Sequence, residues 1–317
     1  MSKVSTAIKL LKENRGEFCA SLLQNSSFLF PDKLYLTLLF RCKMGYWIDW
    51  KNPKTFSEKL QWLKLYDRKP EYTTMVDKFA VKEYVANLIG EEYIIPTLGV
   101  WDTPEDINWD ELPNQFVLKT THGGGNTGVV ICKDKVTFDK KSAIEKLNRS
   151  LKSCIFKSYR EWPYKNVKRR IIAEQYMEDR ESEDLIDYKF YCFNGEPIYC
   201  QVIRDRRSKE TIDFYDVDWN HMSFVGLNPI AENSLVSIVK NGITQVVKPY
   251  KLEDMLSICS KVASQIPFVR VDLYSIQSKV YMGEITFYPA SGLGVFTPKE
   301  WNDKLGKFIS LPRIDNK

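Results

Sequence analysis

The sequence predicts an α+β fold in which the strands of each sheet pair antiparallel. A β-rich stretch, 186–204, is divided by Asn194-Gly195, a strong hairpin signal because both turn positions favour positive φ. A second β-rich stretch, 268–287, also divides into two runs and predicts a last hairpin. Strand-like and helical segments do not alternate regularly along the chain, which disfavours a parallel βαβ sheet.

The first 70 residues are predicted to be mainly helical. Thr55 and Glu58 have the spacing of a capping box, so a helix is expected to begin there. A second helix is expected over 74–88, with its end marked by Gly90. Each helix has apolar residues on one face: Phe56, Leu60 and Leu63 in the first, and Val81, Val85 and Leu88 in the second.

The rest of the chain combines short strands with two further helices. Strands are predicted over 93–100, 116–119, 129–132 and 171–177, and helices over 140–151 and 252–262.

Composition excludes several classes of protein. The formal net charge of +5 is too small to indicate nucleic-acid binding. The seven Cys residues include no CxxC pair and the chain has two His residues, so no structural zinc site is expected. Scattered cysteines in odd number are typical of reduced thiols, and the N-terminus has no signal-peptide pattern, so we expect a cytoplasmic protein.

The longest apolar stretch, 34–40, is far shorter than the roughly 20 residues that span a bilayer. Lys33, Arg41 and Lys43 flank this stretch, and Trp47 follows it. Peripheral contact with the inner face of a membrane therefore stays open beside the alternative of a core helix.

A glycine-rich segment, 122–128, joins two of the predicted strands. Glycines let backbone N–H groups approach phosphates closely, and Lys119 at the base of the segment offers a positive charge. A strand rather than a helix follows Gly128, so the segment is neither a P-loop nor a dinucleotide fingerprint. We expect a flap that closes over a triphosphate; the alternative is a mobile hairpin turn without a ligand.

Two acidic residues lie on the strands of the last hairpin. Arg270 and Asp272 share one strand face because side chains alternate with period two, and Glu284 and Thr286 share a face of the next strand. If the strands pair, both acids can converge, and two carboxylates with substrate phosphates are a common Mg²⁺ site. The alternative is a salt bridge from Arg270 to one of the acids.

Seven segments together resemble the ATP-grasp superfamily, and more closely its teichuronopeptide-synthesis (TupA-like) branch of polysaccharide-biosynthesis proteins. The resemblance covers roughly residues 35–298. The segments are NPKTFSEKLQW (52–62), VDKFAVKEYV (76–85), FVLKTTHGGGNTG (116–128), IIAEQYMED (171–179), DYKFYCFNG (187–195), VRVDLY (269–274) and GEITFYPASG (283–292).

The resemblance implies an ATP-grasp fold, with two lobes whose antiparallel sheets clasp ATP. A helical N-terminal region, 1–70, would precede the ATP-grasp domain, 71–317. The lobe 71–177 would hold the glycine flap and the first nucleotide lysines, and the lobe 178–317 would hold the Mg²⁺-binding acids.

The resemblance also implies roles for individual residues. Lys78, on the helix after Asp77, matches the first nucleotide lysine, although Lys82 competes with it. Thr286 stands where the family usually has an Asn. The other nucleotide residues implied are Lys119, the flap residues Thr121, His122, Gly123, Gly124, Gly125 and Asn126, the adenine-binding Glu174, Gln175, Tyr176 and Met177, and Asp187. The Mg²⁺ ligands implied are Asp272 and Glu284, and the catalytic residues are Arg270, Lys189 and Arg204.

The function implied is an ATP- and Mg²⁺-dependent carboxylate–amine ligase that forms an amide through an acyl phosphate. The partners implied are a carboxylate-bearing sugar or glycan, as in a capsule or other cell-surface polysaccharide, and an amine or amino acid. A sugar kinase on the same fold, a glycosyltransferase and a nucleotide-binding regulatory module stay as alternatives. The sequence leaves the oligomeric state and the identity of both substrates open.

Overall fold

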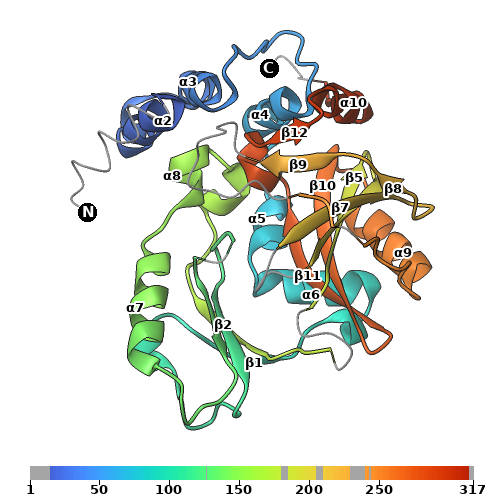
Figure 1. Ribbon diagram of the computed structural model, residues 1–317. Helices are drawn as coiled ribbons and strands as arrows, with labels where there is room; N and C mark the ends of the chain where they lie inside the picture. The colour runs from blue at the N-terminus through green and yellow to red at the C-terminus, as the bar shows by residue number, and fades with distance from the viewer. Residues whose placement is uncertain are drawn as a thin grey trace.

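The computed structural model describes residues 15–125, 127–179, 185–204, 210–228, 240–242 and 244–313. Within them the chain forms a four-stranded sheet, a six-stranded sheet and a two-stranded ribbon, with helices around them (Figure 1). All strand pairs within these sheets are antiparallel, as the sequence predicts.

The smaller sheet is built from four short strands in the order β1-β4-β2-β3. They are β1 (Thr97–Trp101), β2 (Phe116–Thr120), β3 (Val129–Cys132) and β4 (Ile171–Gln175). Helix α7 (Lys140–Leu151) packs against this sheet, and its Leu147 joins Phe116, Leu118 and Ile171 in a separate apolar cluster. The sheet therefore has a small core of its own.

The larger sheet has the order β11-β10-β5-β6-β7-β8 and contains both predicted hairpins. Asn194 and Gly195 have φ values of 50° and 95°, as the hairpin signal requires. The strands are β5 (Asp187–Phe193), β6 (Glu196–Arg204), β7 (Thr211–Asp216), β8 (His221–Met222), β10 (Phe268–Ile276) and β11 (Lys279–Thr286). The ribbon pairs β9 (Val225–Asn228) with β12 (Val295–Thr297).

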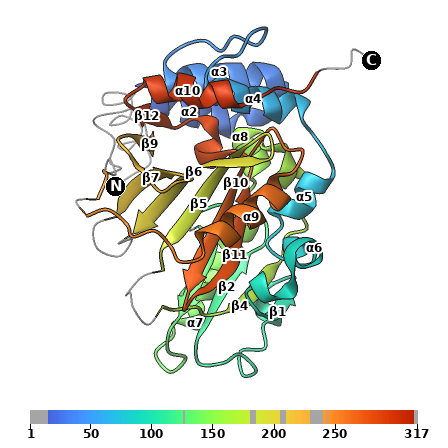
Figure 2. The ribbon, with the colours of Figure 1, turned by 90° about the vertical axis from the view of Figure 1, so that its right-hand side faces the viewer.

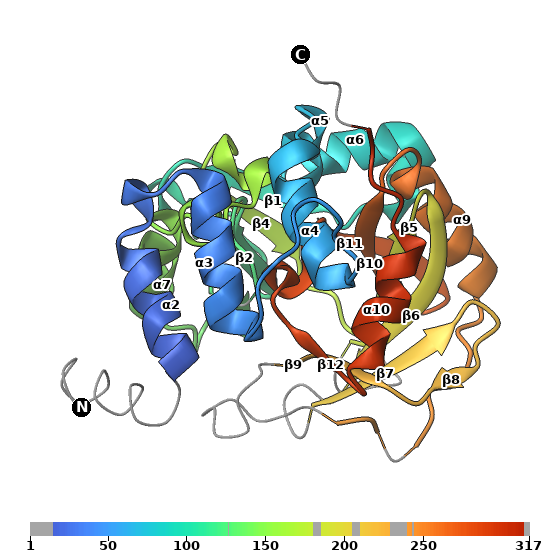
Figure 3. The ribbon, with the colours of Figure 1, turned by 90° about the horizontal axis from the view of Figure 1, so that it is seen from above.

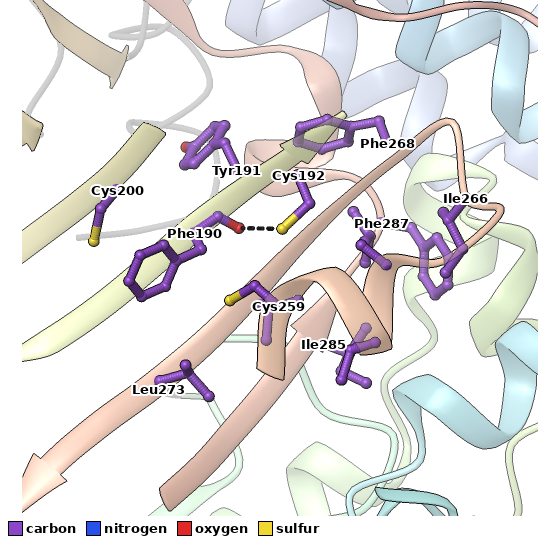
Figure 4. Close-up of a cluster of buried hydrophobic side chains, with 14 of the residues drawn as sticks. Phe190, Tyr191, Cys192, Cys200, Cys259, Ile266, Phe268, Leu273, Ile285 and Phe287 are labelled. Carbon is purple, nitrogen blue, oxygen red and sulfur yellow. Dashed lines mark hydrogen bonds between the residues drawn. The ribbon is translucent and has the colours of Figure 1, made fainter. Parts of the chain in front are cut away.

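The two faces of the larger sheet have different chemistry. Helix α9 (Leu252–Ala263) packs against β5, β6 and β10 (Figure 2), and Cys192 on β5 and Cys259 on α9 contact each other in this layer. Phe190, Cys192 and Cys259 belong to the main apolar cluster, part of which Figure 4 shows. Because side chains alternate along a strand, the other face is left for the charged residues of β10 and β11.

The N-terminal helices divide between two clusters. Helices α2 (Arg15–Asn25) and α3 (Asp32–Met44) form an apolar cluster with each other, and α3 lies beside α4 in Figure 3. Helix α4 (Phe56–Tyr66) instead shares the main cluster with the larger sheet and packs on α10 (Glu300–Phe308). The capping box at Thr55 is confirmed.

The apolar stretch 34–40 lies within α3, where Leu36, Leu39 and Phe40 are buried and Leu34 is exposed. This favours the core-helix interpretation for most of the stretch. No helix in the part of the chain that the structure describes has the length and apolar character needed to cross a membrane.

The single helix expected over 74–88 is wrong, because the chain forms α5 (Glu71–Val76) and α6 (Ala80–Ile89) with a break at Asp77. The Asp77 carboxylate accepts the backbone N–H groups of Phe79 and Ala80, at 2.9 and 3.3 Å, as a helix N-cap does. This bond competes with helix continuation. The strand expected over 93–100 begins only at Thr97, because Pro96 has no N–H to donate.

Candidate active site

A pocket lies where the two main sheets approach each other. The smaller sheet contributes Lys119 and Glu174, and the larger sheet contributes Met282 and Gly283 from β11. The remaining lining residues are Lys78, Val81, Lys82, Ile94 and Ile95. The pocket thus combines cations with an apolar wall, as a nucleotide site requires.

Glu174 is the centre of a buried ion-pair cluster in this pocket. Its carboxylate binds Lys82 Nζ and Lys119 Nζ, each at 2.6 Å, although these lysines come from α6 and β2. Burial by itself would raise the pKa of Glu174. The charges of Lys119 and Lys82 have the larger and opposite effect, so the pKa is lowered to about 2. Glu174 therefore stays ionised and holds both lysines at the pocket wall.

The predicted convergence of the acids on the last hairpin is confirmed. Asp272 lies directly opposite Glu284 across the β10–β11 pair, and Arg270 lies opposite Thr286. Arg270 binds both oxygens of Asp272 at 2.7 and 2.8 Å, and its Nη2 donates to Thr286 Oγ1 at 3.1 Å. The alternative salt bridge from Arg270 to Asp272 thus also exists, but Asp272 is buried rather than on the surface.

Lysines complete the charge balance of the two acids. Lys189 on β5 lies opposite Asp272 and binds its carboxylate, with Asp187 Oδ1 3.6 Å from Lys189 Nζ. Lys78 binds the carboxylate of Glu284. Burial by itself would raise the pKa of Glu284. The charges of Lys78, Arg270 and Lys189 have the larger and opposite effect, so the pKa lies below its usual range. Glu284 is therefore anionic at neutral pH.

The two acids fit a Mg²⁺ site of the kind that phosphates complete. They offer hard carboxylate oxygens on one strand face, which is the donor set that Mg²⁺ prefers. No group of three or more His, Cys, Asp or Glu side chains within the described ranges could hold a metal. Asp272 and Glu284 would therefore share the ion with oxygens of a bound nucleotide.

Lys78 and Lys82 reach the pocket from different positions. Lys78 lies in the turn between α5 and α6, so its predicted place on a helix is wrong. Its backbone N–H donates to Thr121 O at 3.0 Å, which joins this turn to the end of β2. Both lysines line the pocket, and which of them is the first nucleotide lysine of the family pattern stays open.

The base of the glycine segment is anchored rather than open. Thr121 and His122 are buried; the Thr121 hydroxyl donates to Lys168 O at 2.8 Å, and His122 Nε2 lies 3.2 Å from Ser150 O. Gly123, Gly124 and Gly125 follow them in the turn. Asn126 lies outside the described residues.

The remaining predicted residues lie at the edges of this arrangement. Gln175 ends β4 and donates its backbone N–H to Pro96 O at 3.0 Å, and Tyr176 and Met177 follow it. Arg204 ends β6 and binds Asp213 at 3.2 Å and Thr244 O at 2.6 Å, so it does not join the acids of β10 and β11.

Sequence reasoning did not identify the apolar wall of the pocket. Ile94 and Ile95 were expected only as part of a strand, and Met282 and Gly283 only as part of the last hairpin. Their residue types carry no signal for a ligand. For Met282 and Gly283, the sequence offers one indication of a role at the pocket, namely that they directly precede Glu284.

Two antiparallel sheets with a lysine-lined pocket between them, and paired acids beside it, define an ATP-grasp architecture, which confirms the predicted fold class. The model of the TupA-like ATP-grasp family matches residues 58–310. The chain therefore belongs to this family. No curated protein sequence matches the chain.

Solved structures with a similar fold include several ligases. D-alanine–D-alanine ligase from Bacillus anthracis matches at 16% identity with a TM-score of 0.37, covering 68% of this chain and 54% of that ligase. D-alanine–D-alanine ligase from Helicobacter pylori matches at 14% identity with a TM-score of 0.40, covering 81% and 70%. A RimK-domain ATP-grasp protein from Sphaerobacter thermophilus matches at 10% identity with a TM-score of 0.39, covering 75% and 69%. The chain spans about half the length of the first of these.

Proposed function

We propose that this protein is a ligase that uses ATP and Mg²⁺ to activate a carboxylate and join it to an amine. The observation that supports the proposal most directly is the gathering of Lys78, Lys82 and Lys119 at one pocket beside Asp272 and Glu284. Cations on one side and paired carboxylates on the other suit a triphosphate with its metal ion.

The residues divide the chemical work between them. Lys78 and Lys119 would bind the phosphates and neutralise charge during phosphoryl transfer, which is mostly a matter of position and electrostatics. Mg²⁺ bound to Asp272 and Glu284 would neutralise the charge of the phosphate oxygens. Arg270 would stabilise the oxyanion that forms when the amine attacks the acyl phosphate.

The reaction balances without a covalent enzyme intermediate. The carboxylate oxygen attacks the γ-phosphorus and ADP leaves; the amine nitrogen then attacks the acyl carbon, and phosphate leaves with the formation of an amide and the loss of a proton. The acceptor that the family resemblance favours is a uronic acid or another carboxylate-bearing glycan of the cell surface. The amine would be an amino acid.

Hydroxylamine trapping tests this reaction. The protein would be incubated with Mg-ATP, hydroxylamine and a panel of uronic acids and amino acids, and hydroxamate and ADP measured by mass spectrometry. With the correct carboxylate we expect hydroxamate and ADP in equal amounts. Lys119→Met should lower the yield by about tenfold or more, whereas Lys33→Met, remote from the pocket, should not.

Other products would contradict the proposal in distinguishable ways. A stable phosphate ester of a sugar hydroxyl, with no hydroxamate, would indicate a kinase. Transfer from a nucleotide-sugar with no ADP formed from ATP would indicate a glycosyltransferase. ATP binding with no ADP release in the presence of the whole panel would indicate a regulatory module.

A further inference from the structure

Two oppositely charged residues are buried outside the nucleotide pocket. Lys64 on α4 is fully buried, and Glu161, which precedes the short helix η4 (Trp162–Lys165), is 5% exposed. Burial lowers the pKa of Lys64 and raises that of Glu161, while each charge partly offsets the shift of the other. Buried charges are costly, so a pair kept in this position needs an explanation.

Both residues hold the same segment, the short turn η5 (Pro289–Gly292). Lys64 Nζ donates to Ser291 O at 2.8 Å, and Ser291 Oγ donates to Glu161 Oε1 at 2.6 Å. Gln61, one helical turn before Lys64, donates to the carbonyl oxygens of Ser291 and Gly292, each at 3.1 Å. Residues about 230 positions apart in sequence thus fix one turn.

The backbone of this turn is unusual. Ala290, Ser291 and Gly292 have φ values of 46°, 56° and 63°, which is the left-handed region that residues with a Cβ rarely adopt. Such strain persists only where the surroundings impose it, and it is concentrated at functional sites. The contacts of Gln61, Lys64 and Glu161 are the surroundings that impose it here.

The turn η5 follows β11, the strand that carries several residues of the active site. Met282 and Gly283 line the pocket, Glu284 binds Lys78, and Thr286 binds Arg270. The turn η5 begins three residues after Thr286, so it directly follows this series of active-site residues. Phosphoryl transfer needs its acceptor in line with the leaving group, on the far side of the transferred phosphate.

The segment that holds the turn through Glu161 also feels the charge of the acid pair. Tyr164 of η4 is buried, and the charges of Glu284 and Glu161 both add to the effect of burial in raising its pKa. Glu161, which accepts a hydrogen bond from Ser291 of η5, and Tyr164 therefore both lie within electrostatic reach of Glu284. Neither η4 nor η5 contributes a residue to the pocket that we assign to the nucleotide.

We propose that Lys64, Gln61 and Glu161 are positioning residues that hold η5 as the acceptor-side wall of the active site. This inference rests on the proposed ligase function. It also relates two segments of the family resemblance, 52–62 and 283–292, because Gln61 in the first donates hydrogen bonds to Ser291 and Gly292 in the second.

Matched lysine variants on α4 test the inference. Lys59 lies on the same helix and also donates to two backbone carbonyls, Gly306 O and Ile309 O, each at 2.8 Å, but at the C-terminal helix. Lys64→Met and Lys59→Met therefore each remove a lysine that donates to the backbone of a distant segment, to one carbonyl oxygen for Lys64 and to two for Lys59. Ser291→Ala is a milder second variant that removes only the contact with Glu161.

For each folded variant we would measure the affinity for a non-hydrolysable ATP analogue with Mg²⁺, and kcat and KM for the carboxylate identified by trapping. Lys64→Met and Ser291→Ala should raise KM for the carboxylate by about tenfold or more with nucleotide affinity unchanged. Lys59→Met should change neither quantity. The backbone N–H groups at positions 291 and 293 bond to Tyr288 O and Ala290 O, so they report on the turn. Hydrogen exchange at these two amides should be faster in Lys64→Met and Ser291→Ala but not in Lys59→Met.

Equal effects of Lys64→Met and Lys59→Met on KM would contradict the inference, as would a loss of nucleotide affinity equal to the rise in KM. Unchanged exchange at Ser291 in Lys64→Met would also contradict it. Absence of hydroxamate from the wild-type protein would contradict the proposed function instead, and the exchange measurements would still decide whether Lys64 holds η5.

Discussion

The cations of the active site are paired with its acids. Lys78 binds Glu284, Lys189 and Arg270 bind Asp272, and Lys82 and Lys119 share Glu174. An unpaired charge in such a place would be destabilising, and each of these five cations has a carboxylate partner. A ligand must therefore exchange partners with these residues.

This exchange leads to a prediction for Lys78. Because Lys78 occupies the carboxylate of Glu284, a divalent cation must compete with it until phosphates bind Lys78 instead. Lys78→Met should therefore bind Mn²⁺ more tightly than wild type in the absence of nucleotide, by about fivefold or more. An electron paramagnetic resonance titration of free Mn²⁺ measures this affinity.

Lys43→Met is the control for this titration, because Lys43 also pairs with a carboxylate, Glu17, but in the N-terminal helices. It should leave the Mn²⁺ affinity unchanged. If Lys78→Met also bound Mn²⁺ as weakly as wild type, the carboxylate of Glu284 would not be the site from which Lys78 excludes the metal ion.

At the scale of elements, the connection between β2 and β3 is held at its base, near Thr120, His122 and Gly128. The Thr120 and Ser150 hydroxyls lie 2.7 Å apart, and Thr120 N donates to Gly128 O at 3.1 Å. A Cβ at Gly128 would lie 2.2 Å from Thr120 Oγ1, so glycine is required there for close packing. If the glycine segment is a flap, the part of it that would close over phosphates is therefore shorter than the expected 122–128.

Hydrogen exchange should reveal this division. Without nucleotide, we expect the amides of Gly124, Gly125 and Thr127 to exchange faster than those of β3, and His122 to be protected with the strands. Addition of a Mg-ATP analogue should slow exchange at Gly124, Gly125 and Thr127. Equal exchange at Gly124 and Gly125 with and without nucleotide would favour a turn with no ligand.

At the scale of the whole molecule, charged residues join the smaller sheet to the larger core. Helix α6 packs in the main apolar cluster, yet its Lys82 binds Glu174 of β4. Arg170, which precedes β4, binds Asp77 at 3.1 Å, and both side chains are largely buried. These contacts set how the two sheets face each other across the pocket.

A double-mutant cycle on Arg170 and Asp77 measures this coupling. Because the pair is largely buried, Arg170→Met and Asp77→Asn together should show a coupling free energy of about 1 to 3 kcal/mol in chemical denaturation. The pair Lys168–Asp102 is the control, since both side chains are more than 60% exposed and their coupling should be close to zero. Similar coupling in the two pairs would show that Arg170 and Asp77 do not join the sheets.

The lobe boundaries inferred from the sequence stay a prediction. The main apolar cluster includes Phe56 and Leu60 of α4 as well as Val81 and Val85 of α6, although the predicted boundary falls between these helices at residue 70. The reason is geometric: an apolar helix face packs on whichever sheet surface is open to it, and sequence order does not specify that surface.

The sequence by itself determined the features that depend on near neighbours. Strand alternation fixed Asp272 and Glu284 on one face, the Asn194-Gly195 turn fixed a hairpin, and Thr55 fixed a helix start, because each depends on the local dihedral angles and side-chain periodicity. These local features were sufficient to predict an α+β fold with antiparallel sheets and the acid pair, whereas the ATP-grasp fold was predicted from the family resemblance.

Only the tertiary structure decided which charges meet. Nothing near Glu174 in the sequence indicates that it holds Lys82 and Lys119, and nothing near Lys64 indicates that it holds Ser291. Such pairs form because folding removes water from charged groups that distant segments bring together, and a buried charge then requires whichever partner lies within reach. That requirement acts through space, so the order of residues along the chain does not express it.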